Sequence, residues 1–179
     1  MPEFMHHAER IPVPTTGELR ADVAALLPLI AKPDREPART MAVLARQPEL
    51  LTPFLGWAAA LALNGELSHR HHELLALRAA CNCGSEFEWV EHVEYAREAG
   101  LTDAEIAAVA QPISGGPWSA AERALLRAAD ELHTDRDVSD ATWQELTAHF
   151  EQPALVEVLF VVGQYTMLSM VANAAGIQA

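Results

Sequence analysis

The chain has 179 residues, with 12 Lys and Arg against 25 Asp and Glu, which gives a formal net charge of −13. Half of the residues are hydrophobic, enough to bury the core of one domain of ordinary size. The excess of acid opposes binding to nucleic acids and to anionic membranes, because both attract Lys and Arg. The first thirty residues show no basic segment followed by a continuous apolar run, so we expect a soluble, cytoplasmic protein.

Prolines crowd the first forty residues of the chain. Among them are Pro12, Pro14, Pro28, Pro33 and Pro37. Such a stretch favours an extended arm over an independently packed domain. We expect residues 1–40 to form an N-terminal arm with the first helix, lying over the core or over a partner subunit. Residues 41–179 would then form the helical domain, with the motif-bearing centre at about 50–111.

Helix-start and helix-stop signals follow one another along the rest of the chain. Thr102 with Glu105, and Ser119 with Glu122, match the capping box, in which a hydroxyl and a carboxylate satisfy each other's backbone N–H groups. Apolar residues recur at helical spacing and no strand–helix–strand alternation is present, so the sequence predicts an all-α fold of eight or nine helices. Their expected ranges are 18–31, 37–46, 50–64, 69–82, 86–99, 103–110, 120–133, 140–149 and 153–175.

The last of these helices carries an uncharged run from Val158 to Ala172. The run is shorter than the ~20 residues that a bilayer requires. Gln164 interrupts it, and no Lys or Arg flanks it. We interpret the run as a buried helix and expect no membrane span.

The segment from Glu73 to His92 concentrates residues that can move protons. An Asn and a Gly near its middle are helix stops, so two helices should meet here in a tight turn. Ser85 opens the second helix, with Glu88 three residues later as a further capping box, and His92 follows one turn beyond Glu88 on the same face. A sharp antiparallel turn would bring Glu73 near His92, and a carboxylate that orients an imidazole suits proton transfer at neutral pH.

These residues resemble the signature of the carboxymuconolactone decarboxylase family, also called the alkylhydroperoxidase D-like (AhpD-like) family. That signature is a Glu, twelve residues to a first position, three more to a second and four more to a His; here these are Glu73, Ser85, Glu88 and His92. Similarity extends over about residues 40–179. The resemblance implies an all-α AhpD-like fold and a homo-oligomer, a trimer or a hexamer, with the pocket near a subunit contact.

The chain departs from the peroxidase-like members of that family at the two middle positions. Those members carry a C-x-x-C pair there, where a helix N-terminus stabilises the thiolate. Ser85 and Glu88 replace both cysteines, so this chain resembles a branch that lacks the pair. Cys81 and Cys83 point about 200° apart on a helix, which disfavours a disulfide between them. Cys83 lies near the turn, where it could still approach His92.

We therefore expect a cofactor-independent, lyase-type enzyme that acts on a small organic acid or lactone, with no metal ion. In this interpretation His92 shuttles the proton, Glu73 orients His92, and Glu88 or Tyr165 contacts the substrate. The catalytic candidates are Glu73, Ser85, Glu88 and His92, and the pocket candidates are Cys83, Trp89, Gln164 and Tyr165. Two other functions stay open: an AhpD-like thiol peroxidase or antioxidant that uses Cys83, and a non-catalytic oligomeric binding protein.

Two further groups bear on these alternatives. His69, His71 and His72 have a spacing that resembles a set of metal ligands, but no second ligand set accompanies them, so we interpret them as a solvated first helical turn. Arg78 and Arg97 are the nearest arginines that could bind a substrate carboxylate.

Overall fold

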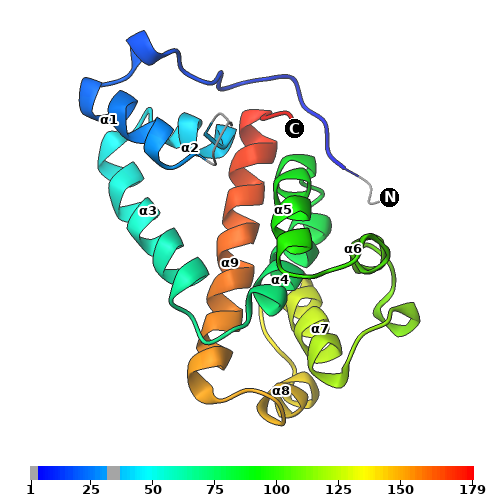
Figure 1. Cartoon of the computed structure of the whole chain (residues 1–179). Helices are drawn as coiled ribbons and strands as arrows, with labels where there is room; N and C mark the ends of the chain where they lie inside the picture. Colours follow the sequence, from blue (N-terminus) through cyan, green and yellow to red (C-terminus); the bar gives the residue numbers. More distant parts are fainter. Residues whose placement is uncertain (1–3, 32–36) are drawn as a thin grey trace.

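The computed structural model describes residues 4–31 and 37–179, and helices are the only regular elements in those ranges. Figure 1 shows the arrangement. The α-helices are α1 (Ala21–Leu26), α2 (Arg39–Leu44), α3 (Pro48–Leu63), α4 (His69–Asn82), α5 (Glu86–Glu98), α6 (Asp103–Val109), α7 (Ala120–Thr134), α8 (Asp140–Thr147) and α9 (Gln152–Ala175). Three single 3-10 turns lie at Thr16–Glu18, Leu27–Leu29 and Ile113–Gly115. The predicted all-α fold is confirmed.

The predicted helix over 18–31 is wrong as a single element. The chain instead forms a 3-10 turn, the short α1 and a second 3-10 turn at Leu27–Leu29. Pro28 explains the break, because proline has no N–H to donate to the carbonyl four residues earlier and its ring crowds that carbonyl. The expectation for Pro33 falls outside the described residues.

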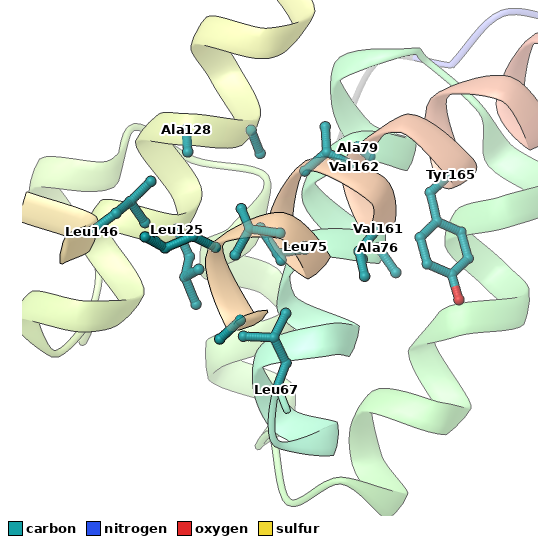
Figure 2. Close-up of a cluster of buried hydrophobic side chains, with 14 of the residues drawn as sticks. Leu67, Leu75, Ala76, Ala79, Leu125, Ala128, Leu146, Val161, Val162 and Tyr165 are labelled. Carbon is teal, nitrogen blue, oxygen red and sulfur yellow. The ribbon is translucent and has the colours of Figure 1, made fainter. Parts of the chain in front are cut away.

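The central helix of the fold is α4, which packs against α5, α7 and α9. Figure 2 shows part of this core, where Leu75, Ala76 and Ala79 of α4 meet α7 and α9. Leu125 and Val161 are among the side chains that α7 and α9 contribute. Alanines on α4 let the neighbouring helices approach closely, and this packing sets which residues of α4 face each neighbouring helix.

A tight turn joins α4 to α5 and sets the two helices side by side. The Gly84 N–H donates to Cys81 O at 3.0 Å, and the Ser85 N–H donates to Ala80 O at 2.9 Å. The predicted capping box of Ser85 with Glu88 is wrong: the Ser85 side chain makes no capping hydrogen bond. The Ser85 N–H already donates to Ala80 O, so it is not available to the Glu88 carboxyl group. That carboxyl group faces His92 instead.

The N-terminal arm lies over the core of its own chain, across the ends of α4 and α9 (Figure 1). The Met5 N–H donates to Gly84 O, and the Arg10 N–H donates to Ala175 O. Gly176 has φ +71°, and a Cβ atom at this position would lie 2.2 Å from Ala8 O. Only glycine therefore combines this backbone conformation with the close approach of the arm.

In the described part of the chain, α9 is the one helix long and apolar enough to cross a bilayer. Half of its most apolar window is buried inside the fold. Its buried residues include Glu157, whose carboxylate accepts the N–H groups of Glu66 and Leu67 at 2.6 and 2.9 Å. These hydrogen bonds anchor the loop that leads into α4.

Candidate functional site

The site is built on a pair of side chains from α4 and α5. Nδ1 of His92 lies 2.7 Å from Oε2 of Glu73, and both side chains are 12% exposed. The structure thus brings together the two residues that the sequence predicts to meet. With its Nδ1–H donating to the Glu73 carboxylate, the imidazole is fixed in one tautomer, and Nε2 is left to accept or release a proton.

Glu88 faces the second nitrogen of the same imidazole. Its Oε2 atom lies 3.8 Å from His92 Nε2, and its Oε1 atom has no hydrogen-bond partner among the described residues. Glu88 is 3% exposed, and this burial raises the pKa of its carboxyl group to about 7. Burial lowers the pKa of His92, but the hydrogen bond with Glu73 and the charges of Glu73 and Glu88 outweigh it, so the net pKa is raised. Glu88 can therefore carry a proton near neutral pH, beside an imidazole whose protonated form is stabilised by Glu73.

Tyr165 of α9 closes the site from the side of the core. Its ring meets the His92 ring edge-on, with centroids 4.4 Å apart, and Figure 2 shows its hydroxyl pointing away from the labelled aliphatic side chains. The hydroxyl oxygen lies 2.9 Å from Nε2 of His72. Burial and the charges of Glu73 and Glu88 raise the pKa of Tyr165 well above its usual value, so the hydroxyl stays protonated and can donate.

His72 is a residue that the sequence analysis missed. It is 3% exposed, so the expectation of a solvated first turn is wrong for this histidine, although His69 is exposed. Burial lowers the pKa of His72, which keeps it neutral. With its proton on Nε2, His72 donates to the Tyr165 oxygen, and the Tyr165 O–H stays free to donate into the cavity. A signal was present: His72, Leu75, Ala76 and Ala79 recur at the spacing of one helix face.

These side chains open into a cavity of about 800 Å³ between α3 and the α5–α9 side of the core. Glu73, Glu88, His92, Gln164 and Tyr165 line it, as the sequence analysis expects for Gln164 and Tyr165. Its apolar lining comes from several elements and includes Ala38, Met41, Phe54, Ala58, Ala62, Leu63, Phe87 and Leu168. The volume suits a small organic molecule.

Three candidates do not line this cavity. Ser85 is fully buried in the turn between α4 and α5. Trp89 lies about 100° around the helix from Glu88, so it points away from the cavity. It packs against Phe4 and against the apolar cluster that includes Ala96 and Trp118. Cys83 faces α7, with its Sγ atom 3.8 Å from Nδ1 of His133, and burial raises the pKa of its thiol.

The two arginines considered for a substrate carboxylate also lie away from the cavity. Arg78 forms a salt bridge with Asp130, and Arg97 forms one with Asp103. The arginine at the cavity is Arg70, which the sequence analysis did not single out. As for metals, the described ranges contain no group of three or more His, Cys, Asp and Glu side chains that could hold an ion.

Residues 48–131 match the model of the carboxymuconolactone decarboxylase family. The match runs from the start of α3 into α7 and contains Glu73, Ser85, Glu88 and His92. Over these 84 of its 179 residues the chain is similar to the carboxymuconolactone decarboxylase family. No curated protein sequence gives a significant match.

Solved structures share the fold of this chain. An uncharacterised peroxidase-related protein from Silicibacter sp. TM1040 is 17% identical with a TM-score of 0.82, covering 99% of this chain and 93% of that one. An alkylhydroperoxidase AhpD core protein from Ralstonia eutropha JMP134 is 22% identical with a TM-score of 0.76, covering 97% and 93%. A variant of the debrominase Bmp8 in complex with 2,3,4-tribromopyrrole is 14% identical with a TM-score of 0.79, covering 97% and 92%. At these identities the likeness shows the AhpD-like fold.

Proposed function

We propose that this protein is a cofactor-independent, lyase-type enzyme that moves protons by acid–base catalysis on a small molecule. The observation that carries the proposal is the 2.7 Å contact between Glu73 and His92 at the wall of an 800 Å³ cavity. Glu88, whose Oε2 atom is 3.8 Å from the other nitrogen of His92, supplies a second proton-carrying group. A positioned acid and base contribute about 10²–10⁴-fold to a rate.

The roles of the four groups at the site follow from their geometry. His92 Nε2 takes a proton from the substrate, and the Glu73 carboxylate holds the ring and stabilises the imidazolium that forms. Glu88, with a pKa of about 7, returns a proton to the departing or rearranged group. Tyr165 keeps a neutral hydroxyl beside the His92 ring, where it can donate to a substrate oxygen.

Of the two substrate classes that we consider, a lactone fits better than an organic acid. Arg78 and Arg97 pair with Asp130 and Asp103 away from the cavity, so neither supplies a carboxylate site. A neutral ring ester avoids bringing a negative charge beside Glu88. Its carbonyl can accept from Tyr165 while His92 removes a proton from the adjacent carbon.

The test is a turnover screen on neutral lactones and on the matching open-chain acids. We expect Glu73→Gln and His92→Asn each to lower turnover of any active compound by about 10²-fold or more. Glu86→Gln removes a charge of the same helix that lies outside the cavity and serves as the control. Unchanged turnover in both site variants would exclude acid–base catalysis by this pair and would favour a non-catalytic binding protein.

An AhpD-like thiol peroxidase is the alternative, and one contact favours it. Sγ of Cys83 lies 3.8 Å from Nδ1 of His133, and a histidine beside a thiol can promote its ionisation. Burial opposes this effect, because it raises the pKa of the thiol. Counting free thiols before and after peroxide treatment of the native protein, with Cys81→Ser as the control, decides the question: loss of the Cys83 thiol supports the peroxidase, and its retention excludes it.

We further propose that the protein works as a homo-oligomer in the cytoplasm. A row of exposed, uncharged side chains runs along α9 at alternating steps of four and three residues: Val156, Phe160, Gly163, Met167, Met170 and Ala174. Such a row suits a helix–helix seam, and an uncharged face lets two copies of an acidic chain approach without repulsion. Phe160→Glu should lower the mass measured by light scattering, whereas Leu29→Glu, at an 80% exposed position elsewhere, should not.

A further inference from the structure

The cavity is lined by more negative than positive side chains. Glu73, Glu88, Glu91 and Glu98 line it, and among the described lining residues Arg70 is the one Lys or Arg. An organic anion entering this cavity would therefore meet several carboxylates.

Arg70 does not offset this charge for a ligand, because its guanidinium group is already engaged. Its Nε donates to Glu122 at 2.8 Å, its Nη2 donates to Glu105, and its Nη1 donates to Gly100 O at 3.2 Å. Two carboxylates from outside the cavity lining thus surround the one arginine. The cation ties the start of α4 to α6 and α7, which is a structural role.

Two of the residues that line the cavity each carry a buried oxygen atom that accepts no hydrogen bond from the described residues. Glu88 Oε1 and Gln164 Oε1 have no partner in the described part of the chain, and the two residues are 3% and 6% exposed. Buried polar atoms in folded proteins are almost always hydrogen-bonded. Both residues line the same cavity from different helices, α5 and α9. Each of the two oxygens has less than 1 Å² of exposed surface, so a ligand group with several N–H bonds reaches both only when the two side chains turn toward the cavity.

The rest of the lining is apolar and partly aromatic. Phe54, Phe87 and Tyr95 contribute rings, and Met41 and Leu168 contribute aliphatic surface. Apolar walls favour an apolar ligand body, and aromatic faces attract a cation more than an anion.

We infer that the molecule bound in this cavity is an apolar amine, with its protonated nitrogen held by Glu88 and Gln164 and its apolar part against α3. The inference rests on the proposed function, since it names the substrate class of that same site. An ammonium group has three N–H donors and no acceptor, so it satisfies both unpaired oxygens and offsets the carboxylates. An amine-bearing lactone combines this property with the neutral ester proposed above. Glu88 is ionised while it holds the ammonium group, so the proton that Glu88 returns in the proposed reaction comes from that ammonium group.

The test is equilibrium binding, measured by calorimetry without turnover, of three probes that share a phenyl ring and a two-carbon arm. They are 2-phenylethylamine, 2-phenylethanol and 3-phenylpropionate, which are cationic, neutral and anionic at neutral pH. We expect the amine to bind about tenfold tighter than the alcohol, because its hydrogen bonds are charge-assisted. The carboxylate should show no saturable binding.

Variants at two glutamates of α5 then test whether Glu88 causes the preference for the amine. Glu88→Gln should lower the affinity of the amine to about that of the alcohol and leave the alcohol unaffected. Glu86→Gln removes the same charge outside the cavity and should change neither affinity. Equal binding of all three probes, tighter binding of the carboxylate, no binding of any probe at millimolar concentration, or an amine affinity indifferent to Glu88→Gln would each overturn the inference.

The outcome is separable from that of the proposed function. His92→Asn should keep the amine preference while it lowers turnover by about 10²-fold or more. If His92→Asn leaves turnover intact but the amine preference depends on Glu88, the acid–base proposal fails and the inferred ligand class stands.

Discussion

Nδ1 of His92 lies 2.7 Å from Oε2 of Glu73, and Nε2 of the same ring lies 3.8 Å from Oε2 of Glu88. The imidazole therefore stands between two carboxyl groups of different character. Glu73 is in hydrogen-bond contact and fixes the ring, whereas Glu88 is buried deeply enough for its pKa to reach about 7. Glu88 can thus carry a proton near neutral pH, close to the Nε2 atom of His92.

The first prediction concerns how Glu73 acts through His92. The hydrogen bond and the charge of Glu73 are what overcome burial and raise the pKa of His92. Glu73→Gln should therefore lower kcat/KM by about 10²-fold and also move the acid limb of the pH–rate profile to lower pH. The profile of the wild type and the variant, measured on any substrate found in the screen, checks both effects. A loss of rate with an unmoved acid limb would show that Glu73 has only a structural role.

The second prediction concerns stability and Glu88. The pKa of this carboxyl group is 4.5 in its ordinary state and about 7 when buried in the fold. Below 4.5 it is protonated in both states, and above 7 the folded protein carries a buried charge. Protonated Glu88 therefore stabilises the fold at low pH, and this stabilisation is lost as the pH rises from 4.5 to about 7. The loss in the free energy of unfolding is about 3 kcal/mol.

Glu88→Gln removes that titration, so urea unfolding at pH 5 and pH 8 measures it. The variant should gain stability relative to the wild type by about 3 kcal/mol between these two pH values. Glu86→Gln, on the same helix but outside the cavity, should follow the wild type. A Glu88→Gln variant that keeps a constant difference from the wild type over this range contradicts the buried-acid interpretation.

The third prediction concerns the buried contact between His72 and Tyr165. Tyr165→Phe keeps the ring in the core but leaves Nε2 of His72 without a partner, in addition to Nδ1, which has no partner among the described residues. An unsatisfied buried polar atom costs about 1–3 kcal/mol, so the free energy of unfolding should fall by that amount. The double variant with His72→Leu should lose about 1 kcal/mol less than the sum of the single variants. Additive losses would mean that the two side chains do not interact.

Local sequence signals predicted the backbone of the site well. The expected helix over 69–82 coincides with α4, because Ser68 caps its start through the His71 N–H and the Asn-Cys-Gly turn ends it. The meeting of Glu73 with His92 follows from that turn and from helical spacing, both of which are properties of neighbouring residues.

The direction of individual side chains was harder to predict. Trp89 was expected in the cavity because it follows Glu88. One helical step instead turns it away from the cavity, against the apolar cluster that includes Ala96 and Trp118. His72 was expected in solvent because no second set of metal ligands accompanies the three neighbouring histidines, yet it is buried and its partner Tyr165 is 93 residues away. Contacts of this kind depend on how α4, α5 and α9 pack, which no local pattern specifies.

The last prediction concerns the N-terminal arm and two glycines with positive φ. Gly100 has φ +88° and open space where a Cβ atom would lie, whereas at Gly176, with φ +71°, a Cβ atom would lie 2.2 Å from Ala8 O. Gly100→Ala should therefore cost only the backbone strain, about 1–2 kcal/mol. Gly176→Ala should cost that strain and also displace the arm.

Trypsin cleavage after Arg10 measures the displacement directly, because the N–H groups of Arg10 and Ile11 donate to Ala175 O in the docked arm. Gly176→Ala should be cut faster than the wild type at this bond, while Gly100→Ala should be cut at the wild-type rate. The two variants share the backbone strain, so any difference between them reports the contact of the arm with the end of α9. Equal cleavage in both variants would mean that the arm does not depend on Gly176 for its docking.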